Sequence, residues 1–235
     1  MIVITSLSPK HANKGVQQDC INAWKKYTDK VISVNAKSEV KELHYNGVEI
    51  IETDQVLSRN NKTYVYLREI LTIAKRECLK HGLETIVLTN SDIKPVMSLE
   101  RIAELCKHAE NGIVYLNRWE YTDIEQNCQR DNRGYDVFIF NIKHIDKFIF
   151  NPFVLGLTHF DFWLPYKAQK EGLTMYNSFN VDVLHKRHKT QYDNRDWIFT
   201  GDILMEHEGL FQFKGKTRSL SDHVQNIITN NSIAI

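Results

Sequence analysis

Cysteine is scarce in this 235-residue sequence, long apolar runs are missing, and neither sign of charge predominates. The four cysteines lie far apart, without the short spacings of a metal knuckle or a signal peptide ahead of them, and indicate reduced, intracellular thiols. No apolar stretch approaches the roughly 20 residues of a membrane-spanning helix. A net charge of +1 gives no overall field that would attract nucleic acid or anionic lipid. These absences predict a soluble, cytoplasmic protein without a transmembrane segment.

The chain also lacks the glycine-rich loops that bind phosphate in two large protein classes. Neither the dinucleotide fingerprint nor the P-loop pattern follows the first predicted strand, which argues against Rossmann dehydrogenases and P-loop kinases. Ser6, Ser8 and Ser91 have no nucleophile-elbow setting, which argues against a serine hydrolase. No repeat or Gly/Ser/Pro-rich linker divides the chain, so we predict a single domain over residues 1–235.

Short β-branched segments alternate with amphipathic segments in the first half of the chain. We predict strands at 2–5, 31–34, 48–51 and 85–88, and helices at 17–27, 64–80 and 98–110. This alternation is typical of βαβ units and predicts an α/β fold with a mainly parallel central sheet flanked by helices. Right-handed crossovers would place Thr5, Asn35 and Asn90 along one edge of that sheet.

The second half of the chain shows weaker periodicity. We predict strands at 113–116, 135–141, 174–176 and 181–184, and helices at 160–171 and 220–228. Segment 117–132 is polar and aromatic without a clean period, and is predicted to be a long surface loop. The apolar end at 233–235 is predicted to make a small core contact, with a membrane or a homodimer contact as the alternatives.

Oxygen-bearing side chains crowd the end of the predicted strand at 85–88. Thr89, Asn90, Ser91 and Asp92 follow it at the carboxyl end, where open α/β sheets bind their ligands. Asn90 and Asp92 are two residues apart, so in an extended turn they could share one Mg or Mn ion, which usually completes its shell with substrate phosphates. An Asx turn that caps the next helix is the alternative.

A second cluster, in segment 182–188, combines imidazoles with cations. His185 and His188 flank Lys186 and Arg187. Imidazole can be a metal ligand, while arginine and lysine suit diphosphate oxygens. A solvated basic turn is the alternative.

Between the two clusters, Asp161 lies among three aromatic residues, at 160, 162 and 163. A carboxylate in such a setting is either a helix cap or a base with a raised pKa. The sequence leaves both interpretations open.

The order of these motifs resembles the GT-A class of nucleotide-sugar glycosyltransferases. In that class a nucleotide-binding half runs into an Asp-x-Asp-type motif at a strand end, and an acceptor half and a late histidine follow. Here Asn90-Ser91-Asp92 resembles that motif with its first carboxylate replaced by an amide, and His185 resembles the late histidine that helps to bind the metal diphosphate. The resemblance implies a single GT-A-like, Rossmann-like domain.

The resemblance also implies roles for further residues. Thr5, Ser6 and Asn35 are similar in place to the strand-end residues that hold the nucleoside, and segment 134–138 resembles the one facing donor sugar and acceptor. Asp161 is similar in position to the carboxylate that acts as base in inverting members. The implied division is a nucleotide-binding half at 1–95, an acceptor half at 96–195 and a C-terminal extension at 196–235.

The function implied is Mn- or Mg-assisted transfer of a sugar from a nucleotide-diphosphate donor to an acceptor hydroxyl, with inversion. A cation on Asp92 and His185, joined by Arg187, would stabilise the departing diphosphate. Asp161 would take the acceptor's proton. Compatible acceptors include a glycan, a lipid-linked sugar, a protein and a modified nucleic acid base. The alternatives are a nucleotidyltransferase that makes an activated sugar and a non-catalytic carbohydrate- or nucleotide-binding module.

Overall fold

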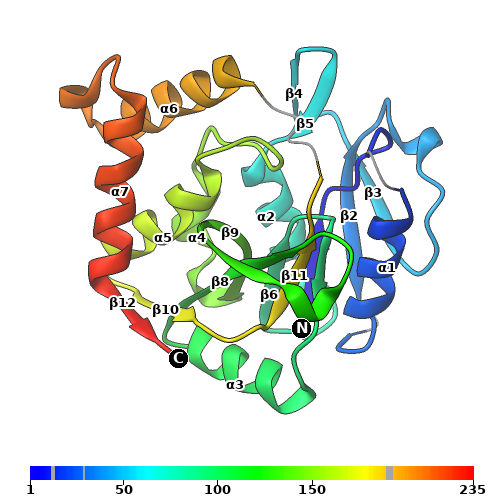
Figure 1. The fold of residues 1–235 in the computed structure, drawn as a ribbon. Coiled ribbons are helices and arrows are strands. Elements are labelled where there is room, and N and C mark those ends of the chain that lie inside the picture. The colour runs from blue at the N-terminus through cyan, green and yellow to red at the C-terminus, as the bar shows by residue number, and fades with distance from the viewer. Residues whose placement is uncertain (12–13, 29, 189–192) are drawn as a thin grey trace.

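The computed structural model describes residues 1–11, 14–28, 30–188 and 193–235 (Figure 1). Its main feature is a ten-stranded sheet in the order β12-β10-β8-β9-β6-β1-β2-β3, with β11 paired to β8 and β7 paired to β11. The strands of this sheet are β1 (Ile2–Thr5), β2 (Val31–Ala36), β3 (Glu49–Thr53), β6 (Thr85–Thr89), β7 (Ile93–Pro95), β8 (Gly112–Tyr121), β9 (Gln129–Asn141), β10 (Thr174–Ser178), β11 (Val183–Lys186) and β12 (Ser232–Ala234). Residues from both predicted halves therefore contribute to one sheet.

Most strand pairs of this sheet are parallel. β1 pairs in parallel with β2 and β6, β2 with β3, and β8 with β10 and β11. β9 runs antiparallel between β6 and β8, and the short β7 runs antiparallel to β11. The predicted α/β fold with a mainly parallel sheet flanked by helices is confirmed.

Helices cover both faces of the sheet (Figure 1). They are α1 (Lys14–Trp24), α2 (Leu67–Lys80), α3 (Leu99–Ala109), α4 (Asp146–Ile149), α5 (Phe160–Lys170), α6 (Asn194–Glu208) and α7 (Thr217–Asn231). Of the described residues, those of α1 and α3 pack on one face, and α2, α4, α5, α6 and α7 belong to the core on the other. No helix in the described part of the chain is long and apolar enough to cross a membrane.

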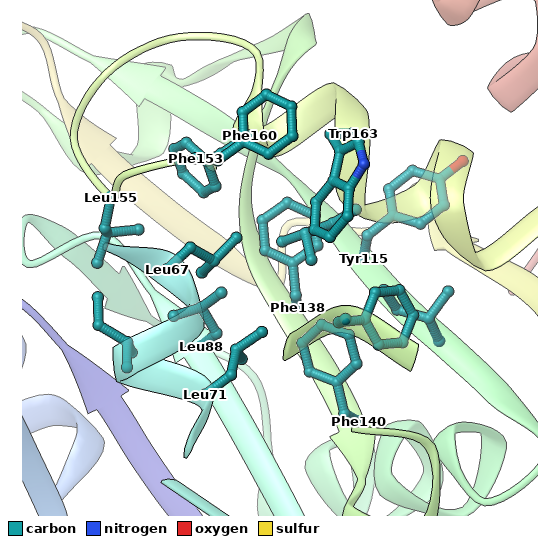
Figure 2. Packing of buried hydrophobic residues seen from close by; sticks show 14 of the residues in the cluster. Leu67, Leu71, Leu88, Tyr115, Phe138, Phe140, Phe153, Leu155, Phe160 and Trp163 are labelled. Atoms are coloured by element: carbon teal, nitrogen blue, oxygen red, sulfur yellow. The ribbon is translucent and has the colours of Figure 1, made fainter. Parts of the chain in front are cut away.

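The alternation of side chains along each strand explains the two cores. Ile2 and Ile4 belong to the larger core with α2, whereas Val3 between them belongs to the core under α1 and α3. Figure 2 shows the larger core, where Phe140 and Trp163 pack among leucines of α2 and β6. Burying one such aromatic side chain stabilises the fold by about 2–3 kcal/mol. Both faces are thus closed, and the strand ends remain available for a site.

A β-hairpin precedes α2, where the sequence predicted helix from residue 64. β4 (Val56–Arg59) pairs with β5 (Lys62–Val65), and α2 begins only at Leu67. The turn consists of Asn60 and Asn61 at φ 50° and 58°, a left-handed conformation that asparagine tolerates better than most residues. Without a glycine in the turn, the pattern gave little hairpin signal.

The prediction of a long surface loop at 117–132 is wrong. β8 continues to Tyr121, β9 begins at Gln129, and Trp119 pairs with Arg130. The register shifts between residues 116 and 117 and again before 119. Such irregularities break the period-two alternation, which is why the sequence showed no strand pattern there.

The C-terminal part contains elements that the sequence did not reveal. α6 begins with a capping box in which the Asp193 side chain accepts hydrogen bonds from the backbone N–H of Asp196. The apolar end forms β12, which pairs in parallel with β10 at the sheet edge. Ile235 packs against the core under α3, while Ile233 is 51% exposed, so the predicted core contact holds for Ile235 only.

Candidate active site

A cavity of about 430 Å³ opens at the edge where β1 and β6 end. Its lining comes from the loop after β1, the segment between β2 and β3, the β4–β5 hairpin, the turn after β6, strands β8 and β9, the loop before α5, and the β11 segment. In open α/β sheets, ligands bind outside the carboxyl ends of the parallel strands, which is the edge where this cavity lies. Of the residues predicted for the site, the cavity lining includes Ser6, Asn90, Asp92 and His185.

Asn35 and Thr5, predicted to hold a nucleoside, are buried behind the cavity rather than in its lining. Asn35 Nδ2 donates to the Leu7 carbonyl at 2.6 Å, and the Leu7 N–H donates to Ser33 Oγ at 2.9 Å. Asn35 therefore fixes the path of the loop that presents Ser6. Thr5 Oγ1 is buried without a hydrogen-bond partner among the described residues.

Three histidines surround the carboxylate of Asp92. The Nε2 atoms of His11 and His185 each lie 3.3 Å from Asp92 Oδ2, and that of His188 lies 3.0 Å away. His185 belongs to β11, His188 follows it, and His11 lies in the loop after β1. The predicted pair of Asp92 and His185 is thus in contact, and two further imidazoles join it.

The charge state of Asp92 follows from these contacts. Burial opposes its ionisation, but hydrogen bonds from His11, His185 and His188 outweigh burial and hold the pKa of Asp92 well below its usual value. The ligand atoms of His11, Asp92 and His188 lie within 4.8 Å of one another. Imidazole nitrogens with a carboxylate oxygen are a donor set that fits a divalent cation.

Glu120 of β8 stands behind His185. His185 Nδ1 lies 3.6 Å from Glu120 Oε1, and the Nε atoms of Arg118 and Arg187 each donate to the Glu120 carboxylate at 3.0 Å. Arg187, predicted to bind diphosphate, is 58% exposed and is not in the cavity lining. Its contact with Glu120 orients that carboxylate instead.

The amide of Asn90 is engaged with a second carboxylate in the cavity, that of Asp136 on β9. Asn90 Nδ2 donates to Asp136, and Arg118 Nη1 donates to Asp136 Oδ2 at 2.9 Å. Burial opposes the charge of Arg118, but the carboxylates of Asp136, Asp131 and Glu120 outweigh it and raise the pKa of Arg118 further. An aspartate at position 90 would place a second carboxylate against Asp136, and the amide of Asn90 avoids this repulsion.

Asp161 lies in the first turn of α5, outside the described cavity lining. Its Oδ1 accepts a hydrogen bond from the backbone N–H of Phe162 at 3.0 Å, and its side chain keeps partial access to solvent. Burial of the carboxylate and the nearby negative charge of Asp136 raise the pKa of Asp161 to about 7. Asp161 therefore combines features of both predicted alternatives, a contact at a helix start and a carboxyl group poised near neutral pH.

Sequence reasoning missed His11, Arg118 and Glu120, and it did not single out Asp136 within segment 134–138. Arg118 and Glu120 lie in the stretch interpreted as a loop, so no strand pattern directed them to the site. His11 follows Ser8-Pro9-Lys10 in the loop after the first strand. Its position in a loop after a strand end was the one feature of the sequence that could have indicated His11 as a site residue.

No protein-family model matches the sequence, and no curated protein is significantly similar to it. Solved structures are similar in fold at low identity. Residues 1–349 of S. aureus TarS, in complex with UDP-GlcNAc, align at a TM-score of 0.54 and 9% identity over 87% of this chain and 65% of that one. A 4-diphosphocytidyl-2C-methyl-D-erythritol synthase from Anaerococcus prevotii aligns at 0.41 and 13% identity over 87% and 97% of the two chains.

A cytidylyltransferase from Leptospira borgpetersenii aligns at a TM-score of 0.43 and 10% identity, over 81% of this chain and 76% of that one. The chain therefore has a GT-A-like, Rossmann-like fold, similar to that of the TarS structure.

Proposed function

We propose that this chain is a metal-assisted glycosyltransferase that moves a sugar from a nucleotide-diphosphate donor to an acceptor hydroxyl, with inversion. One observation carries the proposal. The cavity at the strand ends has Asp92 and His185 in contact on one side and the fixed carboxylate of Asp136 on the other. TarS, which has the same fold, binds UDP-GlcNAc, and this supports a nucleotide-sugar donor.

The donor would lie with its diphosphate beside Asp92 and His185. Asp92 and His185 would hold a divalent ion, which would supply positive charge beside the leaving diphosphate. Ser6 and the loop that Asn35 fixes lie at the adjoining strand end, where they would contact the nucleoside. Asp136 and Arg118 would hydrogen-bond the donor sugar, since both line the cavity.

Asp161 would act as the base that takes the proton of the acceptor hydroxyl. A base works best when its pKa lies near the working pH, and the pKa of Asp161 is raised to about 7. Its partial exposure outside the donor cavity allows an acceptor to approach from solvent. The negative charge of Asp136 nearby would also favour transfer of the proton to Asp161.

A donor screen tests the proposal. The purified chain is incubated with Mn²⁺ and a panel of UDP-, GDP-, CDP- and dTDP-sugars, and release of nucleoside diphosphate is measured. We expect slow hydrolysis of one donor class, and loss of this activity by about 10³-fold in Asp92→Ala. The exposed Asp123→Ala is the matched control and should retain activity. Full activity in Asp92→Ala would refute the role of Asp92.

The two alternative functions give different products. A nucleotidyltransferase would release pyrophosphate from a nucleoside triphosphate and a sugar 1-phosphate, with no turnover of finished nucleotide sugars. A binding module would bind a nucleotide or sugar in calorimetry and turn over neither. Either result would replace glycosyl transfer as the function of this cavity.

A further inference from the structure

Three imidazole nitrogens meet at a single oxygen of Asp92. Besides their distances of 3.0–3.3 Å to Oδ2, the Nε2 atoms of His185 and His188 lie 3.2 Å from each other. One carboxylate oxygen offers two lone-pair sites, so it cannot accept three full hydrogen bonds. Two ring nitrogens this close also require one of them to lack a proton. These hydrogen bonds alone do not account for the convergence. Ligand atoms of His11, Asp92 and His188 lie within 4.8 Å of one another, as ligands of one divalent ion would, and His185 adjoins this group.

Regular structure holds two of these residues in place without help from a ligand. Asp92 lies in the turn after β6, which the N–H of Ile93 closes by donating to the Asn90 carbonyl at 3.4 Å. His185 lies within β11, in register with Glu120 of β8 on one side and Ile93 of β7 on the other. The positions of Asp92 and His185 are therefore set by the fold itself, before any nucleotide binds.

The environment of His185 is that of a metal-bound imidazole. Its Nδ1 atom is buried and has no hydrogen-bond partner within the described part of the chain, yet Glu120 Oε1 lies only 3.6 Å away. Histidine ligands commonly bind the ion through one nitrogen and direct the other N–H to a carboxylate, which fixes the tautomer. Arg118 and Arg187 hold Glu120 in the position needed for this.

We propose that His11, Asp92, His185 and His188 form a resident site for a first-row transition metal, which binds without nucleotide and in preference to Mg²⁺. Three imidazoles with one carboxylate suit Co²⁺, Ni²⁺ and Zn²⁺, whereas Mg²⁺ prefers an all-oxygen shell and retains its waters. The inference rests on the same cavity as the proposed function and names the class of its metal. In a site of the kind described under Proposed function, the protein supplies few ligands and the nucleotide supplies the others. The site proposed here differs because the protein itself supplies four.

The test measures metal binding without turnover. The full chain is stripped with a chelator and titrated with Co²⁺ in the absence of nucleotide, with its d–d absorption as the signal and calorimetry for Mg²⁺. We expect one Co²⁺ per chain, displaced by Zn²⁺ and bound at least about 100-fold more tightly than Mg²⁺. Equal affinity for Mg²⁺, or Co²⁺ binding that requires added UDP, would overturn the proposal.

Variants assign the ligands. His11→Ala and His188→Ala should each weaken Co²⁺ binding by about tenfold or more. His44→Ala, which removes an exposed imidazole outside the cavity lining, should leave it unchanged. Circular dichroism checks that each variant is folded. An unchanged Co²⁺ affinity in folded His11→Ala would overturn the four-ligand site.

A measurement on the unsubstituted chain covers the case in which variants fail to fold. Electron paramagnetic resonance of the Cu²⁺-loaded chain should show nitrogen hyperfine coupling from three imidazoles, and coupling from a single imidazole would contradict the site. The two proposals also fail separately. Tight Co²⁺ binding without turnover of any nucleotide sugar would refute glycosyl transfer alone. Turnover with Mg²⁺ and no tight Co²⁺ site would refute this inference alone.

Discussion

Two regions of the cavity hold their side chains in different ways. The strand-end region comprises residues 5–11 and 90–92. Its loop after β1 is positioned by neutral hydrogen bonds to backbone, namely those that Asn35 and Ser33 make with Leu7. The ribbon, residues 117–136 of β8 and β9, is positioned by charge. There Arg118 binds three carboxylates, at distances of 2.7–3.0 Å, namely those of Asp131, Asp136 and Glu120.

This difference in how the two regions are held suits two proposed tasks, donor binding at the strand ends and proton transfer beside the ribbon. Neutral hydrogen bonds fix the loop that presents His11 without adding charge beside Asp92, so the strand-end region can accept a cation and its diphosphate. Arg118 instead binds Asp136, which lies near Asp161, and burial together with the negative charge of Asp136 raises the pKa of Asp161. We therefore expect changes on the ribbon side to act on proton transfer, and changes at the strand ends to act on donor binding.

The largest effect is expected on the transfer rate when the proposed base, Asp161, is replaced. Asp161→Asn should slow sugar transfer by about 10³-fold, equivalent to about 4 kcal/mol, because the amide cannot take a proton. Donor affinity in calorimetry should stay unchanged, because Asp161 lies outside the cavity lining. In the unsubstituted chain the rate should rise with pH and level off above about 7, as Asp161 becomes ionised. An unaffected rate in Asp161→Asn would show that Asp161 is not the base and that its role is the structural contact at the start of α5.

The next effect concerns His159, which ties the start of α5 to α6 and α7. His159 is buried, its two ring nitrogens lie 2.9 Å from Thr200 Oγ1 and Ser221 Oγ, and burial lowers its pKa to about 4. Between pH 6.5 and 4 the unfolded chain binds a proton that the folded chain does not. The free energy of unfolding should therefore fall by up to about 3 kcal/mol as the pH is lowered through this window.

Urea unfolding at pH 7 and pH 4.5 measures this effect. His159→Asn, which suits the left-handed backbone at φ 70° and does not titrate, should show a smaller loss of stability on acidification. The exposed His44→Asn should keep the full loss. An identical pH dependence in His159→Asn would show that other groups cause it.

Exchanging the amide and the carboxylate of Asn90 and Asp136 tests the contact between the strand-end region and the ribbon. Asn90→Asp should place a carboxylate against Asp136 and destabilise the fold at pH 7 by about 2 kcal/mol, the equivalent of a pKa shift of one to two units. The double variant Asn90→Asp with Asp136→Asn should regain most of this stability, because one carboxylate again faces one amide. Chemical denaturation of the four combinations gives the coupling energy, and a double variant no more stable than Asn90→Asp would contradict the contact.

The smallest effect is expected at the hairpin that forms one wall of the cavity. Arg59 Nε donates to the buried Asp196 at 2.6 Å, and this links β4 to the start of α6. Arg59→Met should lower stability by about 1 kcal/mol and weaken nucleotide binding several-fold, because Asn61 and Tyr64 of the hairpin line the cavity. Arg195→Met, at an arginine 81% exposed on the same helix, is the control, with an expected change below about 0.5 kcal/mol. Equal effects in both variants would argue against the link.

Local signals in the sequence were sufficient for much of the strand-end region. The β-branched run of β1 was enough to predict that strand. The start of α3 was predicted from its N-cap, where Ser98 Oγ accepts a hydrogen bond from the Arg101 N–H at 3.1 Å. The resemblance to the GT-A class implied that Asp92 and His185 lie close together, and the two are in contact. Arg118 and Glu120 could not be foreseen, because register shifts beside Asn117 hide the strand that carries them. His11 depends on the path of a loop, which no periodic pattern specifies.

The residues around Asp92 come from widely separated parts of the chain, and this affects how the protein is made. His11 precedes Asp92 by 81 positions, and His188 follows it by 96. Closing two such long segments onto one point costs entropy that only the finished sheet can offset. A chain still on the ribosome, with β11 not yet synthesised, lacks His185 and His188 and so has half the ligands. In the proposed site, cation binding by all four residues would therefore begin only after His188 has been synthesised.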